Sequence, residues 1–265
     1  SMEMIACSYA IYLLSRATSK SGGEWKSMLF VCLAGFVAWP FSALAAAPLA
    51  IAMLFSSSLT IKRLFSLAVQ FISVASLVLV PLIIVDTIAY HGLDNLAHLT
   101  VKDLIIAPWN IFSYNVLKQP EGGSALYGVE PWYFFLFNGA LNFNIAWPLA
   151  LVSLPCSLIL LWKRKESLKA AMLLASPVLL WTTFMSSQAH KEERFLFVVY
   201  PLMAASAGIC LATVCTSLFG THVDDNQKQQ KQKRKKSCVH QEVCGMVVIG
   251  MILITFSAFS VSRIL

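Results

Sequence analysis

The feature that most constrains this chain is a run of 30 residues, 27–56, that contains no charged side chain. A helix that crosses a bilayer needs about 20 mainly apolar residues, so this run is too long for one untilted span. Pro40, which directly follows Trp39, lacks a backbone donor and breaks or kinks a helix. The run therefore predicts two short helices that meet near residues 39–42, with one long kinked helix as the alternative.

Further apolar segments recur along the chain, at residues 4–14, 66–88, 132–161, 168–188, 195–219 and 243–262. Charged residues make up only 12% of the chain, whereas a soluble domain carries about 25%, so too few charges remain to cover a core in water. Each segment is interpreted as a helix, because an open sheet edge in lipid would leave backbone groups unpaired. The sequence predicts an all-α polytopic membrane protein with about seven or eight membrane segments.

Two of these segments differ from a simple span. Residues 4–14 are too few to cross alone, and with no signal sequence ahead of them they indicate the interior of a longer protein. Within 132–161, the stretch "NGALNFN" at 138–144 predicts a short helix at the membrane surface that leads into a span.

Basic residues orient the predicted helices, because loops rich in Lys and Arg stay in the cytosol. They fall into four clusters: Arg16, Lys20 and Lys26; Lys62 and Arg63; Lys163, Arg164, Lys165 and Lys169; and the tract 228–236. Placing all four in the cytosol is consistent if residues 27–56 cross the membrane twice, and residues 89–131 and 190–194 then face the opposite compartment. This placement makes 220–242 a basic cytosolic loop before a final membrane helix at 243–265, and it argues against nucleic-acid binding despite the net charge of +7.

Five ionisable residues stand in a row between two apolar segments: His190, Lys191, Glu192, Glu193 and Arg194. An arginine fork suits bidentate recognition of phosphate, and a lysine adds a compact positive charge. The two glutamates could fix these cations or accept hydrogen bonds from sugar hydroxyls, and the histidine can exchange a proton near neutral pH. The cluster predicts a site for a phosphate-bearing polar ligand whose tail stays in the membrane, with a solvated turn as the alternative.

Aromatic and amide side chains gather in residues 107–144. Aromatic rings suit the apolar faces of sugars and amides suit their hydroxyls, although Trp and Tyr also gather at membrane interfaces for other reasons. The residues predicted to bind a sugar or an acceptor are Tyr127, Glu130, Trp132, Tyr133, Asn142 and Asn144.

The stretch "HKEERF" at 190–195, followed by "VVYPL", resembles the signature of glycosyltransferase family 22. These are endoplasmic-reticulum mannosyltransferases that use dolichyl-phosphate mannose. Its two-glutamate form is similar to that of the alpha-1,2-mannosyltransferases of asparagine-linked glycosylation. The resemblance extends to "WPFSA" at 39–43, "IAPWNIFSYNV" at 106–116, "YGVEPWYFF" at 127–135 and "NGALNFN", and it covers roughly residues 1–219.

The resemblance implies a GT-C-type multi-helix fold over residues 1–219, in the endoplasmic-reticulum membrane with its active face in the lumen. It implies transfer of mannose from dolichyl-phosphate mannose to the dolichyl-diphosphate-linked oligosaccharide, with inversion, forming alpha-1,2 linkages. Residues 190–194 are then expected to bind the donor phosphate and sugar, with no cofactor and no metal ligands in this portion. The family's catalytic base lies in its first luminal loop, which is expected upstream of Ser1. No residue of this chain is therefore assigned as the base, and the chain alone is expected not to turn over.

Three other interpretations stay open. A related member of the family could form alpha-1,6 linkages or act in glycosylphosphatidylinositol assembly. A truncated form without the first luminal loop would be inactive. An ion-coupled carrier is disfavoured, because the charges lie at span ends and no internal repeat is visible.

Overall fold

The computed structural model describes residues 1–18, 22–56, 59–92, 100–117, 128–162 and 164–219. These residues form helices and connecting segments, with no strand in the described ranges. The chain divides into two compact units, Ser1–Phe135 with Ser176–Leu202 and Leu136–Ala175 with Met203–Leu265. The predicted loop 220–242 and the predicted helix 243–265 lie outside the described residues.

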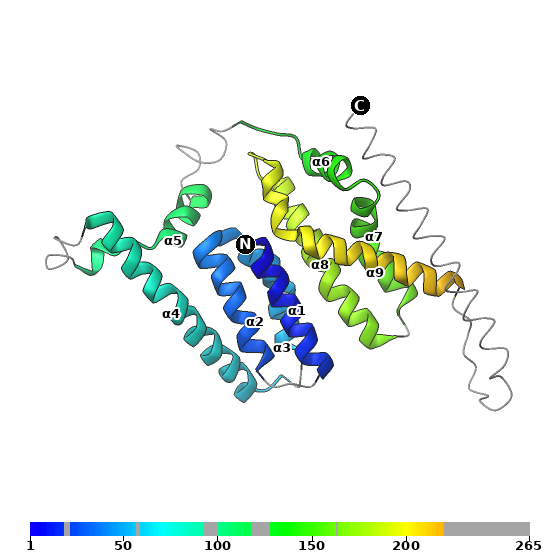
Figure 1. Ribbon diagram of the computed structural model, residues 1–265, viewed down its shortest axis with the longest axis horizontal. Coiled ribbons are helices and arrows are strands. Elements are labelled where there is room, and N and C mark those ends of the chain that lie inside the picture. The colour runs from blue at the N-terminus through cyan, green and yellow to red at the C-terminus, as the bar shows by residue number, and fades with distance from the viewer. Residues whose placement is uncertain (19–21, 57–58, 93–99, 118–127, 163, 220–265) are drawn as a thin grey trace. The chain divides into compact units, whose positions relative to one another are not determined.

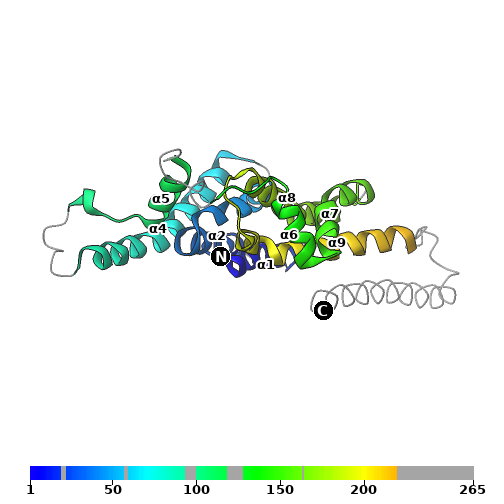
Figure 2. The same cartoon turned by 90° about the horizontal axis from the view of Figure 1, so that it is seen from above.

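The first unit is built around its amino-terminal helices. Its elements are α1 (Met2–Thr18), α2 (Gly23–Cys32), the π-helix η1 (Leu33–Ala38), the 3-10 helix η2 (Pro40–Ala46), α3 (Ala47–Leu54), α4 (Ile61–His91), η4 (Val101–Asp103), α5 (Ala107–Phe112), η5 (Ser113–Leu117), the second part of α8 (Lys165–Ser187) and η7 (Glu193–Val199). Figure 1 shows α2 between α1 and α4, and the view in Figure 2 keeps the same order.

Small side chains let α1 and α2 approach closely. The hydroxyl of Ser27 in α2 donates to the carbonyl of Ser8 in α1 at 2.5 Å, and both residues are fully buried. A Cβ atom on Gly23 would overlap the side chain of Ser15. Glycine and serine at such positions bring helix backbones together where no hydrophobic effect drives them. The predicted segment 4–14 is thus the middle of a 17-residue packed helix.

The predicted interruption near residues 39–42 is confirmed. Trp39 is extended, with φ −156° and ψ 117°, and Pro40 begins the 3-10 helix that follows. The amide of Trp39 donates to the carbonyl of Ala34 at 2.8 Å, and its own carbonyl accepts from the amide and hydroxyl of Ser42 at 2.9 and 2.7 Å. The interruption therefore leaves the backbone groups of Trp39 paired.

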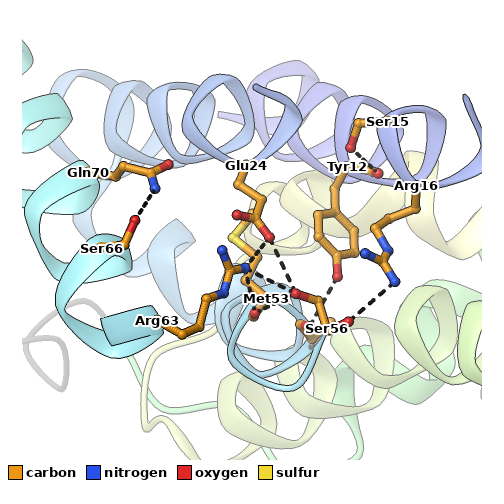
Figure 3. A network of polar contacts seen from close by, with 10 residues as sticks. Tyr12, Ser15, Arg16, Glu24, Met53, Ser56, Arg63, Ser66 and Gln70 are labelled. Atoms are coloured by element: carbon orange, nitrogen blue, oxygen red, sulfur yellow. Dashed lines mark hydrogen bonds and ion pairs between the residues drawn. The ribbon is translucent and has the colours of Figure 1, made fainter. Parts of the chain in front are cut away.

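A polar network joins α1, α2, the end of α3 and the start of α4 (Figure 3). The guanidinium of Arg63 forms an ion pair with Glu24 and donates to the carbonyl of Met53 at 3.2 Å and to the hydroxyl of Ser56 at 3.1 Å. Arg16 donates to the carbonyl of Ser56 at 3.4 Å. Because these groups come from four elements, the network fixes their ends relative to one another.

The second unit contains a sharp bend. Its elements are α6 (Phe134–Phe143), α7 (Ala146–Leu160), the first part of α8 (Lys165–Ser187) and most of α9 (Tyr200–Phe219). Asn144 has a φ of 50°, which ends α6, and the axes of α6 and α7 differ by 113°. The segment is thus a short helix followed by a second helix, as predicted, while its place at the membrane surface stays a prediction.

Three described helices are long and apolar enough to cross a membrane: Ile61–His91, Ser167–Ser187 and Glu193–Ser217. The bent pair α6 and α7 makes a fourth if it counts as one span. The prediction of seven or eight segments is not confirmed. Within the described residues, the difference arises because α1 has 17 residues, α2 has 10 and Pro40–Leu54 is a short apolar helix, all below the length of about 20 needed to span. The predicted segment 243–262 lies outside the described residues.

Candidate functional site

The charged motif occupies the connection between α8 and η7, both of which belong to the first unit at this point. α8 ends at Ser187, and η7 begins at Glu193 with Glu192 as its extended N-cap, φ −132° and ψ 148°. The indole nitrogen of the fully buried Trp181 donates to the carbonyl of Phe195 at 2.7 Å. This bond fastens the start of η7 to α8 and fixes where the motif ends.

Three of the five charged residues interact with one another. Nε2 of His190 lies 2.8 Å from Oε1 of Glu192, and an amino group of Arg194 donates to the same oxygen at 3.0 Å. Nε of Arg194 pairs with the other carboxylate oxygen, Oε2, so the arginine holds Glu192 through two contacts. The side chain of Arg194 remains 69% exposed. Arginine carries five N–H donors, so it can bind a further anion while it holds Glu192.

Both ring nitrogens of His190 face hydrogen-bond acceptors. Its Nδ1 lies 3.3 Å from the carbonyl oxygen of Gly128, and its Nε2 faces the carboxylate of Glu192. Both partners are acceptors, so both contacts are hydrogen bonds together only when each ring nitrogen carries a proton. The hydrogen bond from His190, followed by the contacts from Arg194, lowers the pKa of Glu192. In the form in which both ring nitrogens of His190 carry a proton, the group has two positive charges and one negative charge.

A cavity of about 410 Å3 opens beside this group. His190, Glu192 and Arg194 line it together with residues from three other segments: Trp39, Phe41, Asn115, Val116, Phe184, Met185, Gln188 and Phe195. The rings of Trp39 and Phe195 are stacked at 5.4 Å between centroids, and Phe41 meets Trp39 edge-on at 5.6 Å. The cavity thus combines a charged side with an aromatic side, which suits a ligand that carries both an anion and a ring or chain.

Lys191 is placed differently from its neighbours in the motif. Its side chain is buried, with only 5% of the residue exposed. Its ammonium donates to the carbonyls of Glu130, at 2.7 Å, and Gln188, at 2.5 Å. Burial lowers the pKa of Lys191, and the carboxylate of Glu130 acts in the opposite direction. Lys191 is not among the described residues that line the cavity.

The remaining predicted residues of the first unit lie around this arrangement. Glu193 is exposed and begins η7, and among the described residues it does not line the cavity. The backbone amide of Glu130 donates to the carbonyl of Ala189 at 3.1 Å, while Trp132 and Tyr133 are exposed and meet edge-on at 5.7 Å. Tyr127 lies outside the described residues.

Asn142 and Asn144 belong to the second unit, where they serve local structure. Nδ2 of Asn142 donates to Oδ1 of Asn138 at 2.8 Å, one helical turn away. The amide of Asn144 donates to the carbonyl of Ala140 at 3.0 Å and its positive φ ends α6. A role for these two residues in sugar binding stays a prediction.

Several cavity residues were missing from the residues predicted to bind the ligand. Phe184, Met185 and Gln188 project from the last turn of α8 and beyond. Their spacing of one and four residues places them on one side of a helix, and this is the signal that could have found them. Trp39 and Phe41 entered the sequence analysis through the helix break and the family resemblance, and not as residues predicted to bind the ligand. Within the described ranges, no three His, Cys, Asp or Glu side chains are placed to hold a metal ion.

Comparison with known proteins shows the family of this chain. The model of the Alg9-like mannosyltransferase family matches residues 1–264. The chain belongs to this family. The family resemblance seen in "HKEERF" is therefore confirmed.

The chain is 34% identical to alpha-1,2-mannosyltransferase ALG9 of Mus musculus over 193 residues, which cover 71% of this chain and 29% of that protein. It is 35% identical to ALG9 of Homo sapiens with the same coverage. GPI mannosyltransferase 3 of Trypanosoma brucei brucei is 33% identical, but over only 40% of the chain. This Alg9-like chain spans about a third of the length of the curated relatives that it matches. No solved structure matches it.

Proposed function

We propose that this chain forms the donor-binding part of an alpha-1,2-mannosyltransferase that takes mannose from dolichyl-phosphate mannose. The observation that carries the proposal is the cavity in which His190, Glu192 and Arg194 face the same space as Trp39 and Phe195. Its charged side suits a phosphate and its aromatic side suits a sugar ring or an isoprenoid chain. Relatives that share 34% and 35% identity are named alpha-1,2-mannosyltransferases, which supports this donor class.

The charges of the site match those of the donor. Dolichyl-phosphate mannose is a phosphodiester with one negative charge, and protonated His190, Glu192 and Arg194 together carry one positive charge. In the reaction an acceptor hydroxyl oxygen bonds to C1 of mannose, and the bond from C1 to the phosphate oxygen breaks. The electron pair of the broken bond stays on dolichyl phosphate, which gains a second negative charge. Cations next to that phosphate stabilise the charge as it develops.

The catalytic base is not assigned to this cavity. Displacement at C1 with inversion requires a carboxylate to take the proton of the acceptor hydroxyl. Glu192 is the carboxylate in the described lining, and its two oxygens are held by His190 and Arg194. A carboxylate so engaged is a poor base, since its contacts lower its pKa. We therefore propose that the base comes from outside the residues that line this cavity.

The acceptor and the compartment form the second part of the proposal. We propose the dolichyl-diphosphate-linked oligosaccharide of protein N-glycosylation as the acceptor, in the endoplasmic-reticulum membrane with the cavity facing the lumen. The distribution of basic residues supports this orientation, because it puts 89–131 and 190–194 on one side. Complementation of cells that lack each linkage would separate the alpha-1,2 activity from alpha-1,6 or glycosylphosphatidylinositol activity.

The test uses the full-length protein in detergent or nanodiscs, with dolichyl-phosphate mannose and the lipid-linked acceptor. Arg194→Gln removes the exposed cation beside Glu192 and should raise the KM for the donor by about tenfold or more, as expected when a charged hydrogen bond is lost. Arg164→Gln, at an exposed arginine of the second unit, is the matched control and should leave the KM unchanged. An unchanged donor KM in Arg194→Gln would reject the proposed donor site.

A further inference from the structure

A short backbone segment, residues 128–130, lies against the charged motif and is here called the strap. The amide of Glu130 donates to the carbonyl of Ala189 at 3.1 Å, and the carbonyl of Glu130 accepts from Lys191 at 2.7 Å. The carbonyl of Gly128 lies 3.3 Å from Nδ1 of His190. The strap therefore meets three consecutive residues, Ala189 and the first two residues of the motif, although it lies about 60 positions earlier in the chain.

We propose that Lys191 is a positioning residue, whose buried ammonium holds the strap in place so that the strap can orient His190 in the cavity. Its effect on mannose transfer rests on the proposed function, whereas its effect on the strap does not. The two basic residues Lys191 and Arg194 of the motif then have different tasks. Arg194 meets the ligand, and Lys191 holds the backbone that positions the imidazole.

The burial of Lys191 is the first step of the argument. An ammonium removed from water is stable only when its N–H groups find acceptors. The carbonyl of Glu130, in the strap, and the carbonyl of Gln188, just before the motif, accept hydrogen bonds from the ammonium. These two bonds hold the ammonium at backbone carbonyls, and Lys191 is not among the described residues that line the cavity, so its position favours a structural link over ligand binding.

The second step leads from the strap to the cavity. Gly128 has a φ of +102°, a conformation that residues with a Cβ atom rarely adopt, and no atom lies within 4 Å of the place where its Cβ would be. Backbone conformation, and not space, therefore favours glycine at this position. With the carbonyl of Gly128 fixed, Nδ1 of His190 has a defined acceptor, and Nε2 then points at Glu192. Glu192 in turn holds Arg194. Loss of either Lys191 or Gly128 should disturb the same series of contacts.

The experiment is a double-mutant cycle in the full-length enzyme, with Lys191→Met, Gly128→Ala and the two combined. Methionine keeps the length of the buried side chain without its charge, and alanine strains the strap without touching Lys191. Each single variant should lower kcat/KM for dolichyl-phosphate mannose by about tenfold, the change expected for one lost hydrogen bond from a charged donor. The double variant should lose no more than either one, since both act through the same contacts.

A second readout does not depend on activity. Hydrogen exchange of the peptide that contains the strap should be about tenfold faster at the amide of Glu130 in Lys191→Met. The exchange rate at the amide of Glu130 should stay near the wild-type rate in Arg194→Gln. It should also stay near that rate in Lys191→Arg, because arginine keeps N–H donors at this position. Val129→Ala, at an exposed strap residue, is the control for the double-mutant cycle and should behave as wild type.

Two results would overturn the proposal. One is exchange at the strap in Lys191→Met that equals the wild type. The other is multiplied losses of kcat/KM in the double variant, which would mean that Lys191 and Gly128 act independently. If the enzyme does not use this donor, the kinetic differences disappear while the exchange result still decides whether Lys191 holds the strap.

Discussion

Replacement of Trp181 by Phe tests how firmly the motif is anchored. Trp181 is fully buried, and its indole N–H is the donor to the carbonyl of Phe195 at 2.7 Å. Its ring also meets Trp39 edge-on at 5.6 Å between centroids. The substitution removes the donor and shortens the ring at once, so both the start of η7 and the aromatic side of the cavity lose support.

The expected loss follows from these two contributions. Loss of the donor to this part-buried carbonyl costs about 1–3 kcal/mol. The smaller ring leaves a void of roughly 40 Å3, which at about 24 cal/mol per Å3 adds about 1 kcal/mol. The sum is a destabilisation of about 2–4 kcal/mol, together with weaker donor binding, because Phe195 and Trp39 both line the cavity.

The measurement is thermal or denaturant unfolding of the full-length protein in detergent, followed by the donor KM. Trp162→Phe is the matched control, since Trp162 is 70% exposed and the same atoms are removed there at little cost. The reasoning is refuted if Trp181→Phe unfolds at the same midpoint as the wild type, or if Trp162→Phe is equally destabilising.

Two further predictions concern charged groups. Glu24→Gln should destabilise the first unit by about 1–2 kcal/mol, because the partly buried Arg63 loses its ion pair. This value lies between those for exposed and buried ion pairs. The control is Glu3→Gln, at the exposed first turn of α1, which should be neutral in the same unfolding assay. The pKa of Glu192 is lowered, so its carboxylate stays ionised and keeps its bonds to His190 and Arg194 as the pH falls through the ordinary glutamate pKa of about 4.3. The stabilising contribution of Glu192 is present above the pKa of the unfolded state and is lost only as the pH falls through the lower pKa of the folded state. The measurement is donor affinity as a function of pH, and an affinity that follows an ordinary glutamate titration would contradict the role given to Glu192.

Local rules predicted the parts of the fold that local chemistry decides. Pro40 was enough to predict the interruption in the apolar run 27–56, because a missing N–H and a fixed φ act on the immediate backbone. The asparagine-rich stretch before α7 likewise predicted a short helix, and Asn144 is the residue that ends it. The number of spans was less predictable, because the extent of an apolar run does not show how long its helices are: α1 has 17 residues and α2 has 10.

The site shows the same division between local and distant information. The charge pattern at 190–194 marked the correct region, and His190, Glu192 and Arg194 do line one cavity. Their aromatic partner Trp39 lies about 150 positions earlier, and no periodicity in the sequence connects the two. The surroundings of Lys191 depend on where two backbone carbonyls lie, and composition carries no information about that.

The paired backbone at Trp39 has a consequence for how deep a polar headgroup can travel. Irregular backbone is tolerated below the bilayer surface only where it is shielded by protein or lines a cavity. Trp39 meets both conditions, because its amide and carbonyl are paired and its ring lines the cavity. For the proposed glycolipid donor, the anionic head would thus meet a paired backbone beside the cavity while its isoprenoid tail stays in the hydrocarbon.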